Sequence, residues 1–117
     1  MPPVDITVDL TAELLNQVKK AASALGHTVV SIQGEAGKIS LVVKDPKNPS
    51  ANQFSVVLDN DNKNKDSFDL QFLINNIKVI NEDYKVEISQ KLISKWSTPN
   101  IDIEYYIALE KTSTYGG

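Results

Sequence analysis

The spacing of apolar and polar residues predicts a strand followed by a helix at the start of the chain. Residues 4–10 alternate between apolar side chains and Asp or Thr, which is typical of a strand buried on one face. From about Thr11 to Leu25 the apolar residues recur at helical spacing. Asp9 and Thr11 are good N-caps, and Gly26 is a natural stop. The opposite face of this helix carries small or polar groups, so it meets water or a polar partner.

Segments rich in Val and Ile then predict three further strands. Residues 27–33 and 38–45 flank a short turn that contains glycine, as in a hairpin. Residues 45–52 hold two prolines and no apolar run, which predicts a loop, and strand character resumes at 53–59. The polar residues 60–65 have no apolar anchor and predict a mobile turn that divides the chain near its midpoint.

The second half repeats this order of elements. Residues 68–72 alternate as a short strand, and 73–80 continue at helical spacing, which predicts a second, shorter helix. Three more strands are predicted at 84–89, 92–96 and 101–109, the last with the clearest alternation in the chain. Both halves therefore follow the order βαβββ, which indicates an internal structural duplication. Two such units build an α+β fold in which two helices pack on one face of antiparallel sheets.

One predicted strand carries little charge, unlike a well-protected edge of a sheet. We therefore expect it to add to the sheet of another chain, with an ordinary internal strand as the alternative. The predicted subunit-contact edge comprises Gln53, Phe54, Ser55, Val56, Val57 and Leu58.

Composition indicates one ordinary globular domain over residues 1–117, of which 112–117 are expected to form a flexible tail. Hydrophobic residues make up 41% of the chain and charged residues 23%, which is enough apolar surface for a core. No apolar run approaches the roughly 20 residues of a membrane span, and the N-terminus lacks the basic and apolar regions of a signal peptide. These features argue against a membrane or secreted protein.

The residue types exclude much familiar catalysis. The chain has no cysteine and a single histidine, His27, so it offers no thiolate, no disulfide and no imidazole pair for a metal. Asp59, Asp61 and Lys63 have the spacing of a calcium loop but lack its glycine and its final Glu. The segment 34–38 lacks the Ser or Thr of a phosphate loop. We therefore predict no enzyme, no metal site and no cofactor.

The element order, the polar-faced helix at 11–25 and the last strand, Ile103–Glu110, carry a resemblance to a known family. With these features the chain resembles the DNA sliding clamps, and most closely the C-terminal half of the clamps of T-even-type bacteriophages. The resemblance runs from about Val4 to Thr112 and is most specific in 68–85 and 105–110. The Tyr-Tyr-aliphatic-Ala ending is similar to that of proliferating cell nuclear antigen, the cellular clamp.

The resemblance implies a processivity factor with no catalytic role. Such clamps form rings that encircle double-stranded DNA without sequence preference and tether the replicative DNA polymerase. A clamp loader and other clamp subunits are further implied partners, with a trimeric ring for the full-length protein. The implied location is the cytoplasm of an infected bacterial host. A protein-binding adaptor that uses the clamp fold without contacting DNA is the alternative function.

Helices line the hole of such rings, so the resemblance implies that helix residues face DNA. The net charge of −3 allows this if the cations lie on the inner helices, because salt screens charge beyond about 10 Å. Exposed lysines are also commonly only solvated, which is the alternative here. The candidate DNA-facing residues are Gln17, Lys19, Lys20, Asn75 and Lys78.

The resemblance also implies an apolar pocket beside the last strand that receives a short tail of a partner protein. Core or edge packing is the alternative role for these residues. The candidate pocket residues are Pro3, Val4, Tyr106, Ala108 and Leu109.

One domain is present where a T-even-type clamp subunit has two. Residues 1–3 are interpreted as a connector between domains or as an engineered start. We accordingly expect a monomer or weak dimer, and a naturally short clamp that assembles as a hexamer is the alternative.

Overall fold

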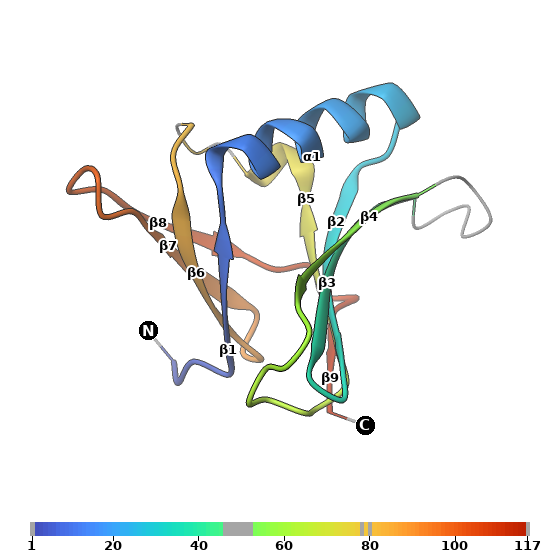
Figure 1. Cartoon of the computed structure of the whole chain (residues 1–117), viewed down its shortest axis with the longest axis vertical. Helices are drawn as coiled ribbons and strands as arrows, with labels where there is room; N and C mark the ends of the chain where they lie inside the picture. Colours follow the sequence, from blue (N-terminus) through green and yellow to red (C-terminus); the bar gives the residue numbers. More distant parts are fainter. Residues whose placement is uncertain (1, 46–52, 78, 80, 117) are drawn as a thin grey trace.

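Two antiparallel sheets and one α-helix make up the part of the chain that the computed structural model describes, residues 2–45, 53–77, 79 and 81–116 (Figure 1). The four-stranded sheet has the order β1-β6-β7-β8, and the five-stranded sheet has the order β4-β3-β2-β5-β9. The helix α1 (Ala12–Leu25) lies across one end of both sheets. The other elements are β1 (Ile6–Leu10), β2 (Val29–Glu35), β3 (Lys38–Lys44), β4 (Phe54–Asp59), β5 (Phe68–Leu73), the 3-10 turn η1 (Ile74–Asn76), β6 (Tyr84–Ser89), β7 (Ile93–Ser97), β8 (Glu104–Ala108) and β9 (Thr114–Tyr115).

The ends of α1 follow the predicted capping signals. The Thr11 side chain accepts a hydrogen bond from the Leu14 amide at 3.1 Å, and Gly26 adopts a left-handed conformation with φ 69°. A longer-range bond adds to the local ones, because the Asp83 carboxylate accepts from the Ala12 amide at 2.7 Å. The first turn of α1 is thus held to the loop that precedes β6.

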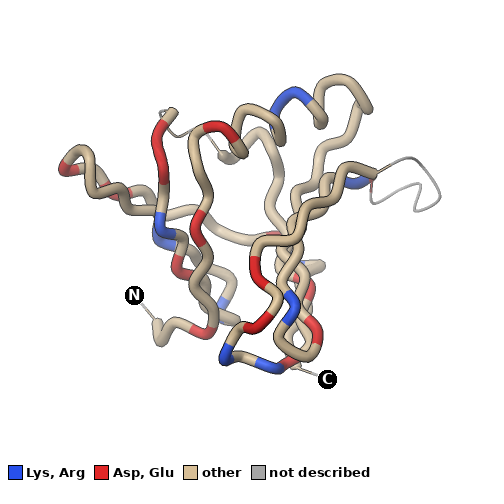
Figure 2. The backbone as a smooth tube through the Cα atoms, in the orientation of Figure 1, with Lys and Arg blue, Asp and Glu red and all other residues tan. Residues whose placement is uncertain are grey.

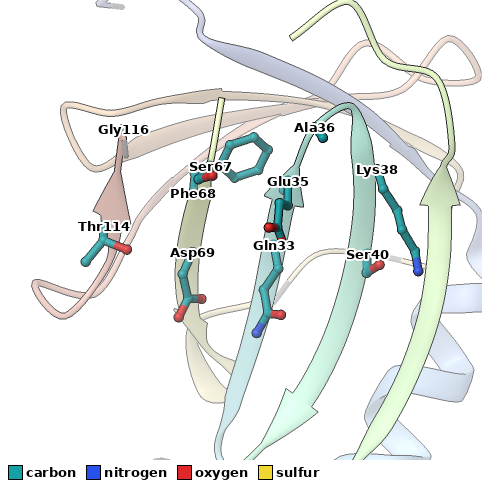
Figure 3. Close-up of a pocket in the computed structure, with 11 residues that line it drawn as sticks. Gln33, Glu35, Ala36, Lys38, Ser40, Ser67, Phe68, Asp69, Thr114 and Gly116 are labelled. Carbon is teal, nitrogen blue, oxygen red and sulfur yellow. The ribbon is translucent and has the colours of Figure 1, made fainter. Parts of the chain in front are cut away.

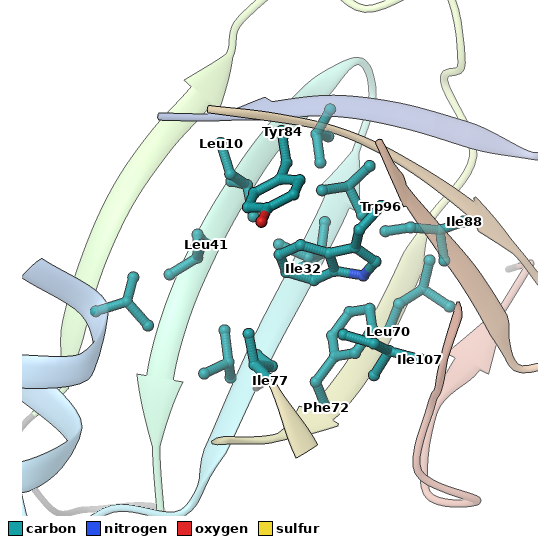
Figure 4. Packing of buried hydrophobic residues seen from close by; sticks show 14 of the residues in the cluster. Leu10, Ile32, Leu41, Leu70, Phe72, Ile77, Tyr84, Ile88, Trp96 and Ile107 are labelled. Carbon is teal, nitrogen blue, oxygen red and sulfur yellow. The ribbon is translucent and has the colours of Figure 1, made fainter. Parts of the chain in front are cut away.

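The core lies between the inner faces of the two sheets and under α1 (Figure 4). Trp96 on β7 is its largest fully buried side chain, and its ring lies 6.0 Å from that of Phe72 and 5.8 Å from that of Tyr84, both edge-on. The indole N–H donates to the Ser94 hydroxyl at 2.9 Å, and that hydroxyl donates to the Ile107 carbonyl at 2.7 Å. The aromatic centre therefore leaves no indole donor unsatisfied.

The predicted second α-helix over 73–80 is wrong for the residues that the structure describes there. Only Ile74–Asn76 are helical, as the single 3-10 turn η1, and residues 78 and 80 lie outside the described part. The Ile74 amide donates to the Thr28 carbonyl at 2.8 Å, so β5 leads into a turn that stays tied to the start of β2. Asn and β-branched residues are weak helix formers, and one turn cannot offset the cost of helix nucleation. The α+β class is confirmed, with one α-helix in the described residues.

The C-terminal residues depart from the flexible tail that we expected. Thr114–Tyr115 form β9, which pairs with Phe68 and Asp69 of β5. The Tyr115 ring stacks on Phe68 at 5.6 Å, and its hydroxyl donates to Asp66 at 2.9 Å. Two residue pairs are few for a strand, so these side-chain contacts supply much of what holds β9 on the sheet.

Candidate functional site

The exposed face of α1 carries the predicted cations. Leu15, Val18 and Ala22 are buried, whereas Gln17, Lys19 and Lys20 are all exposed, as predicted. Glu13 in the first turn is the only acid on the helix. Neither lysine belongs to the ion pairs found among the described residues, so both ammonium groups are available to an outside anion.

Asn75 lies at the same end of the molecule as α1. It is exposed in η1, whose first residue is bonded to Thr28, shortly after the end of α1. Figure 2 shows the positively charged stretch of α1 at this end of the backbone. Lys78, the remaining candidate for a DNA-facing cation, lies outside the described residues.

The five residues predicted to form a peptide pocket do not come together. Pro3 and Val4 are exposed before β1, whereas Tyr106 and Ala108 are exposed on β8. β1 and β8 are opposite edges of the four-stranded sheet, separated by three strand spacings or roughly 14 Å. Leu109 is only 5% exposed and packs in the core, with its amide bonded to the Leu92 carbonyl at 3.0 Å. The structure therefore does not bring the five residues together in one place, although Tyr106 and Ala108 share one outward face.

Strand register adds two neighbours to Tyr106 and Ala108 that the sequence did not single out. Ile93 lies opposite Ala108, and Lys95 lies opposite Tyr106. The Lys95 ammonium is 3.4 Å from Glu104, and this carboxylate raises the pKa of Lys95. The outer face of β7 and β8 is thus a small apolar strip beside an ion pair. Both strands were predicted from the sequence, but their register was not.

β4 is an edge strand, as one of the two sequence interpretations expected. It pairs only with β3, and it ends the order of the five-stranded sheet. Phe54, Val56 and Leu58 pack against the core, whereas Ser55 and Val57 face away from it, with Val57 45% exposed. No charge interrupts the strand before Asp59, so its free backbone edge lacks the usual protection.

A carboxylate-centred network on the outer face of the five-stranded sheet was not predicted. Figure 3 shows Asp69, the residue at its centre, on β5 between Gln33 of β2 and Thr114 of β9. Asp69 on β5 accepts hydrogen bonds from the Ser31 hydroxyl, from the Gln71 amide at 2.9 Å and from the Lys44 ammonium at 3.1 Å. Gln71 in turn accepts from the Thr112 hydroxyl at 2.6 Å. The network therefore links three strands to the segment that leads into β9. Apart from Gln71, the members lie far from Asp69 in the chain, and no local sequence pattern pairs them with it.

The network predicts a pH dependence of stability. Burial alone would raise the pKa of Asp69, but the hydrogen bonds from Ser31, Gln71 and Lys44 outweigh it and the pKa is lowered. Because the native pKa lies below the unfolded value of about 3.9, the carboxylate's contribution is complete above that value and is lost as the pH falls through the native pKa. Asp69→Asn should cost about 1–2 kcal/mol at neutral pH and progressively less below about pH 4.

Chemical unfolding between about pH 3 and pH 7 would measure this difference. Asp61→Asn is the matched control, since the Asp61 side chain is 97% exposed and its ion pair with Lys65 lies on the surface. A constant cost of Asp69→Asn across this range would contradict the assignment.

No metal site is found in the part of the chain that the structure covers. Among these residues, no group of three or more His, Asp or Glu side chains could hold a metal ion. In the segment with calcium-loop spacing, the Asp59 carboxylate is hydrogen-bonded within its own turn. It accepts bonds from the Asp61 amide and from the Asn62 side chain, both at 3.0 Å. These bonds lower the pKa of Asp59. Of the helices described, none is long and apolar enough to cross a membrane.

Comparisons of sequence and of structure with known proteins find matches to the same kind of protein. Residues 7–111 match the family model described as gp45 sliding clamp, C terminal. The chain is 31% identical over 104 residues to the sliding clamp of Vibrio phage KVP40, a match that covers 87% of this chain and 46% of the phage protein. Two structures of the Caulobacter crescentus polymerase III beta clamp superpose with TM-scores of 0.61 and 0.62, each at 16% identity over 93% of this chain and 31% of the bacterial one. The structural matches show a shared fold, and the chain spans about half the length of its phage relative.

Proposed function

The chain belongs to the gp45 sliding-clamp family as a C-terminal domain, and from this membership we propose that it is one domain of a processivity factor. In this role a ring of such domains encloses duplex DNA and keeps a replicative polymerase on its template. The task is topological, so it requires no catalytic group. The observation that carries the proposal is the family match over 7–111, which includes α1 and β8.

We assign the DNA-facing surface to the exposed side of α1 and to η1. Lys19 and Lys20 supply cations on α1. Gln17 supplies an amide donor from the same helix, and Asn75 supplies one from η1, which is bonded to Thr28 just after α1. Lys78 is included in this surface on the basis of the sequence alone. Contacts from such groups to phosphates position DNA without reading its sequence, which suits a ring that slides. The overall charge of −3 does not oppose this, because phosphate attraction is local at physiological salt.

We assign the docking of a polymerase tail to the outer face of β8. Tyr106 is 57% exposed, and Ala108 is too small to cover the half-buried Ile93 beside it. An apolar side chain of the tail would fill the space above Ala108 and pack against the Tyr106 ring. Leu109 supports this strand from the core, and Pro3 and Val4 have no part in the site.

Further subunits would attach at the β4 edge, Gln53 to Leu58, where main-chain groups face outward. Sheet extension from one copy to the next would close a ring, which we take to be trimeric for the full-length protein. A clamp loader is the further partner that such a closed ring requires. The proposed location is the cytoplasm of an infected bacterium, where a phage polymerase works.

Amide-resolved NMR titration of the chain with a short DNA duplex tests the DNA-facing assignment. Shifts should centre on α1 and Asn75, and Lys19→Gln/Lys20→Gln should flatten the slope of log affinity against log salt by about 2, because each lysine would neutralise one phosphate. Lys63→Gln/Lys65→Gln is the matched control, because these lysines lie in the loop before β5. Equal effects of the two double variants would contradict the assignment.

The same spectra, recorded with a peptide from the C-terminal tail of a phage replicative polymerase, test the tethering role. Saturable shifts at Tyr106, Ala108 and Ile93 are expected. Binding of the peptide without any response of α1 to DNA would favour a protein-binding adaptor over a clamp.

A further inference from the structure

The β7–β8 hairpin ends in a tip that exposes two isoleucines. The apolar alternation of the last strand begins at Ile101, but β8 itself begins only at Glu104. Ile101 and Ile103 are 36% and 38% exposed, whereas Ile107, later in the same series, is 7% exposed in the core. Figure 1 shows the hairpin reaching out beyond the rest of its sheet. The alternating apolar series that includes the core residue Ile107 thus begins with two exposed side chains, Ile101 and Ile103.

Acidic residues lie next to these isoleucines in the chain and in the loop before β6. Residues 101–104 are Ile-Asp-Ile-Glu, and all four are exposed. The Asn100 side chain donates to the Glu82 carboxylate at 2.8 Å, which brings the loop before β6 to the tip. Residues 81–83 and 98–104 together contain four acids, Glu82, Asp83, Asp102 and Glu104, and no lysine or arginine. Figure 2 shows this acidic corner at the hairpin tip and the start of β6.

The nearest cations on the same sheet already face carboxylates. Lys95 pairs with Glu104 at 3.4 Å, and Lys85 lies opposite Asp9 in the register of β6 and β1. Glu82 and Asp102 take part in none of the ion pairs found in the described residues. The corner therefore keeps an excess of negative charge around its apolar centre.

A shallow groove adjoins the tip on the side of β1. Ser97, Thr98 and Pro99 of the hairpin form one side of it, and Asp9, Thr11, Asp83 and Lys85 form the other. A bound segment that covered the isoleucines would extend into this groove. There it would meet the Asp9 and Asp83 carboxylates as well as Lys85.

We propose that the hairpin tip, Ile101 and Ile103 with Glu82, Asp83 and Asp102, is a docking site for a partner protein segment that combines apolar and basic side chains. Apolar side chains of the segment cover the two isoleucines, and its Lys or Arg groups pair with the surrounding carboxylates. Charge excludes the other occupants: DNA and anionic lipid would be repelled, and a second copy of the tip would oppose acid with acid. The site is separate from α1 and from the β4 edge, and it adjoins the outer face of β8 at Glu104 without including Tyr106 or Ala108, so it goes beyond the proposed function.

NMR titration with a short synthetic peptide in which Leu and Lys alternate tests the proposal. Saturable shifts should centre on 82–83 and 98–104, and Ile101→Ser/Ile103→Ser should weaken binding at least about tenfold. Glu82→Gln/Asp102→Asn should weaken it severalfold and reduce its dependence on salt. Ile101, Asp102 and Ile103 are exposed, and Glu82 is half-buried. Because Gln at position 82 can still accept from Asn100, the variants should keep the native spectrum elsewhere.

Matched controls separate docking at the tip from general attraction to an acidic protein. Val4→Ser removes an aliphatic side chain that is 42% exposed elsewhere, and Asp61→Asn removes a carboxylate that is 97% exposed elsewhere. Both should leave the affinity unchanged, and a peptide of alternating Leu and Glu should not bind. Shifts centred away from the tip, equal weakening by the controls, or no shifts at all would overturn the proposal. Its failure would leave the DNA response of α1 untouched, so the two outcomes are distinguishable.

Discussion

Replacing Trp96 with alanine is expected to lower the free energy of unfolding by about 3–5 kcal/mol, which is a large part of the total for a domain of this size. Trp96 is 1% exposed, and it packs between the rings of Phe72 and Tyr84, which belong to different sheets. Truncation opens a cavity where the two sheets meet, and it leaves the Ser94 hydroxyl without its indole donor.

Urea unfolding followed by far-ultraviolet circular dichroism would measure this loss, because Trp96 is the only tryptophan and its fluorescence disappears with it. Trp96→Phe is the matched control. It keeps an aromatic ring in contact with Phe72 and Tyr84, so it should cost less than half as much. Equal costs for the two variants would mean that the ring packing contributes little and that the indole hydrogen bond dominates.

Local patterns in the sequence predict the elements whose stability is decided locally. The alternation at 4–10 and the caps of the helix at 11–25 are each visible within one turn or one strand, and the structure confirms β1 and α1 with small shifts at their ends. The failed helix at 73–80 shows the limit of this reasoning. Ile77, one of the apolar residues at helical spacing, is buried there, but so is Val79, which does not belong to that spacing.

The candidate surfaces depend on pairing across the sheets, which a single sequence does not contain. The family resemblance singled out Tyr106 and Ala108, but Ile93 joined them only through register. Val4 was placed with them by analogy and lies at the other edge of the sheet. The Asp69 network likewise joins Ser31, Lys44 and Thr112 across three strands and a loop. Tertiary arrangement, rather than propensity, decides each of these sites.

Positive and negative charges are concentrated on different surfaces of this molecule. The exposed face of α1 carries two lysines and one acid, whereas the hairpin tip and the loop before β6 carry four acids. The net charge of −3 for the whole chain therefore does not describe the charge of either surface. In the two proposals above, a duplex would approach the lysines of α1 and be repelled by the tip, so the proposed DNA surface and the proposed docking site would not compete.

Replacing Gly34 with alanine is expected to destabilise the domain by about 1–3 kcal/mol and to loosen β9 more than any other element. Gly34 on β2 lies opposite Phe68 on β5, and a Cβ at this position would overlap the Phe68 ring. That ring stacks on Tyr115, and the Gly116 amide that follows is bonded to Ser67 at 2.9 Å. Displacing Phe68 therefore disturbs the main contact that holds a strand of only two residues.

Hydrogen exchange of the Thr114–Gly116 amides would report this loosening separately from global unfolding, which urea titration would measure. The control replaces the displaced ring with a smaller side chain. Phe68→Leu makes room for the methyl group that Gly34→Ala adds. The cost of Gly34→Ala should then be smaller in a Phe68→Leu background than in the native one, a coupling expected for residues in direct contact. Additive costs, or unchanged exchange at 114–116, would show that β9 is held by its backbone bonds and by the Tyr115 hydroxyl rather than by the ring stack.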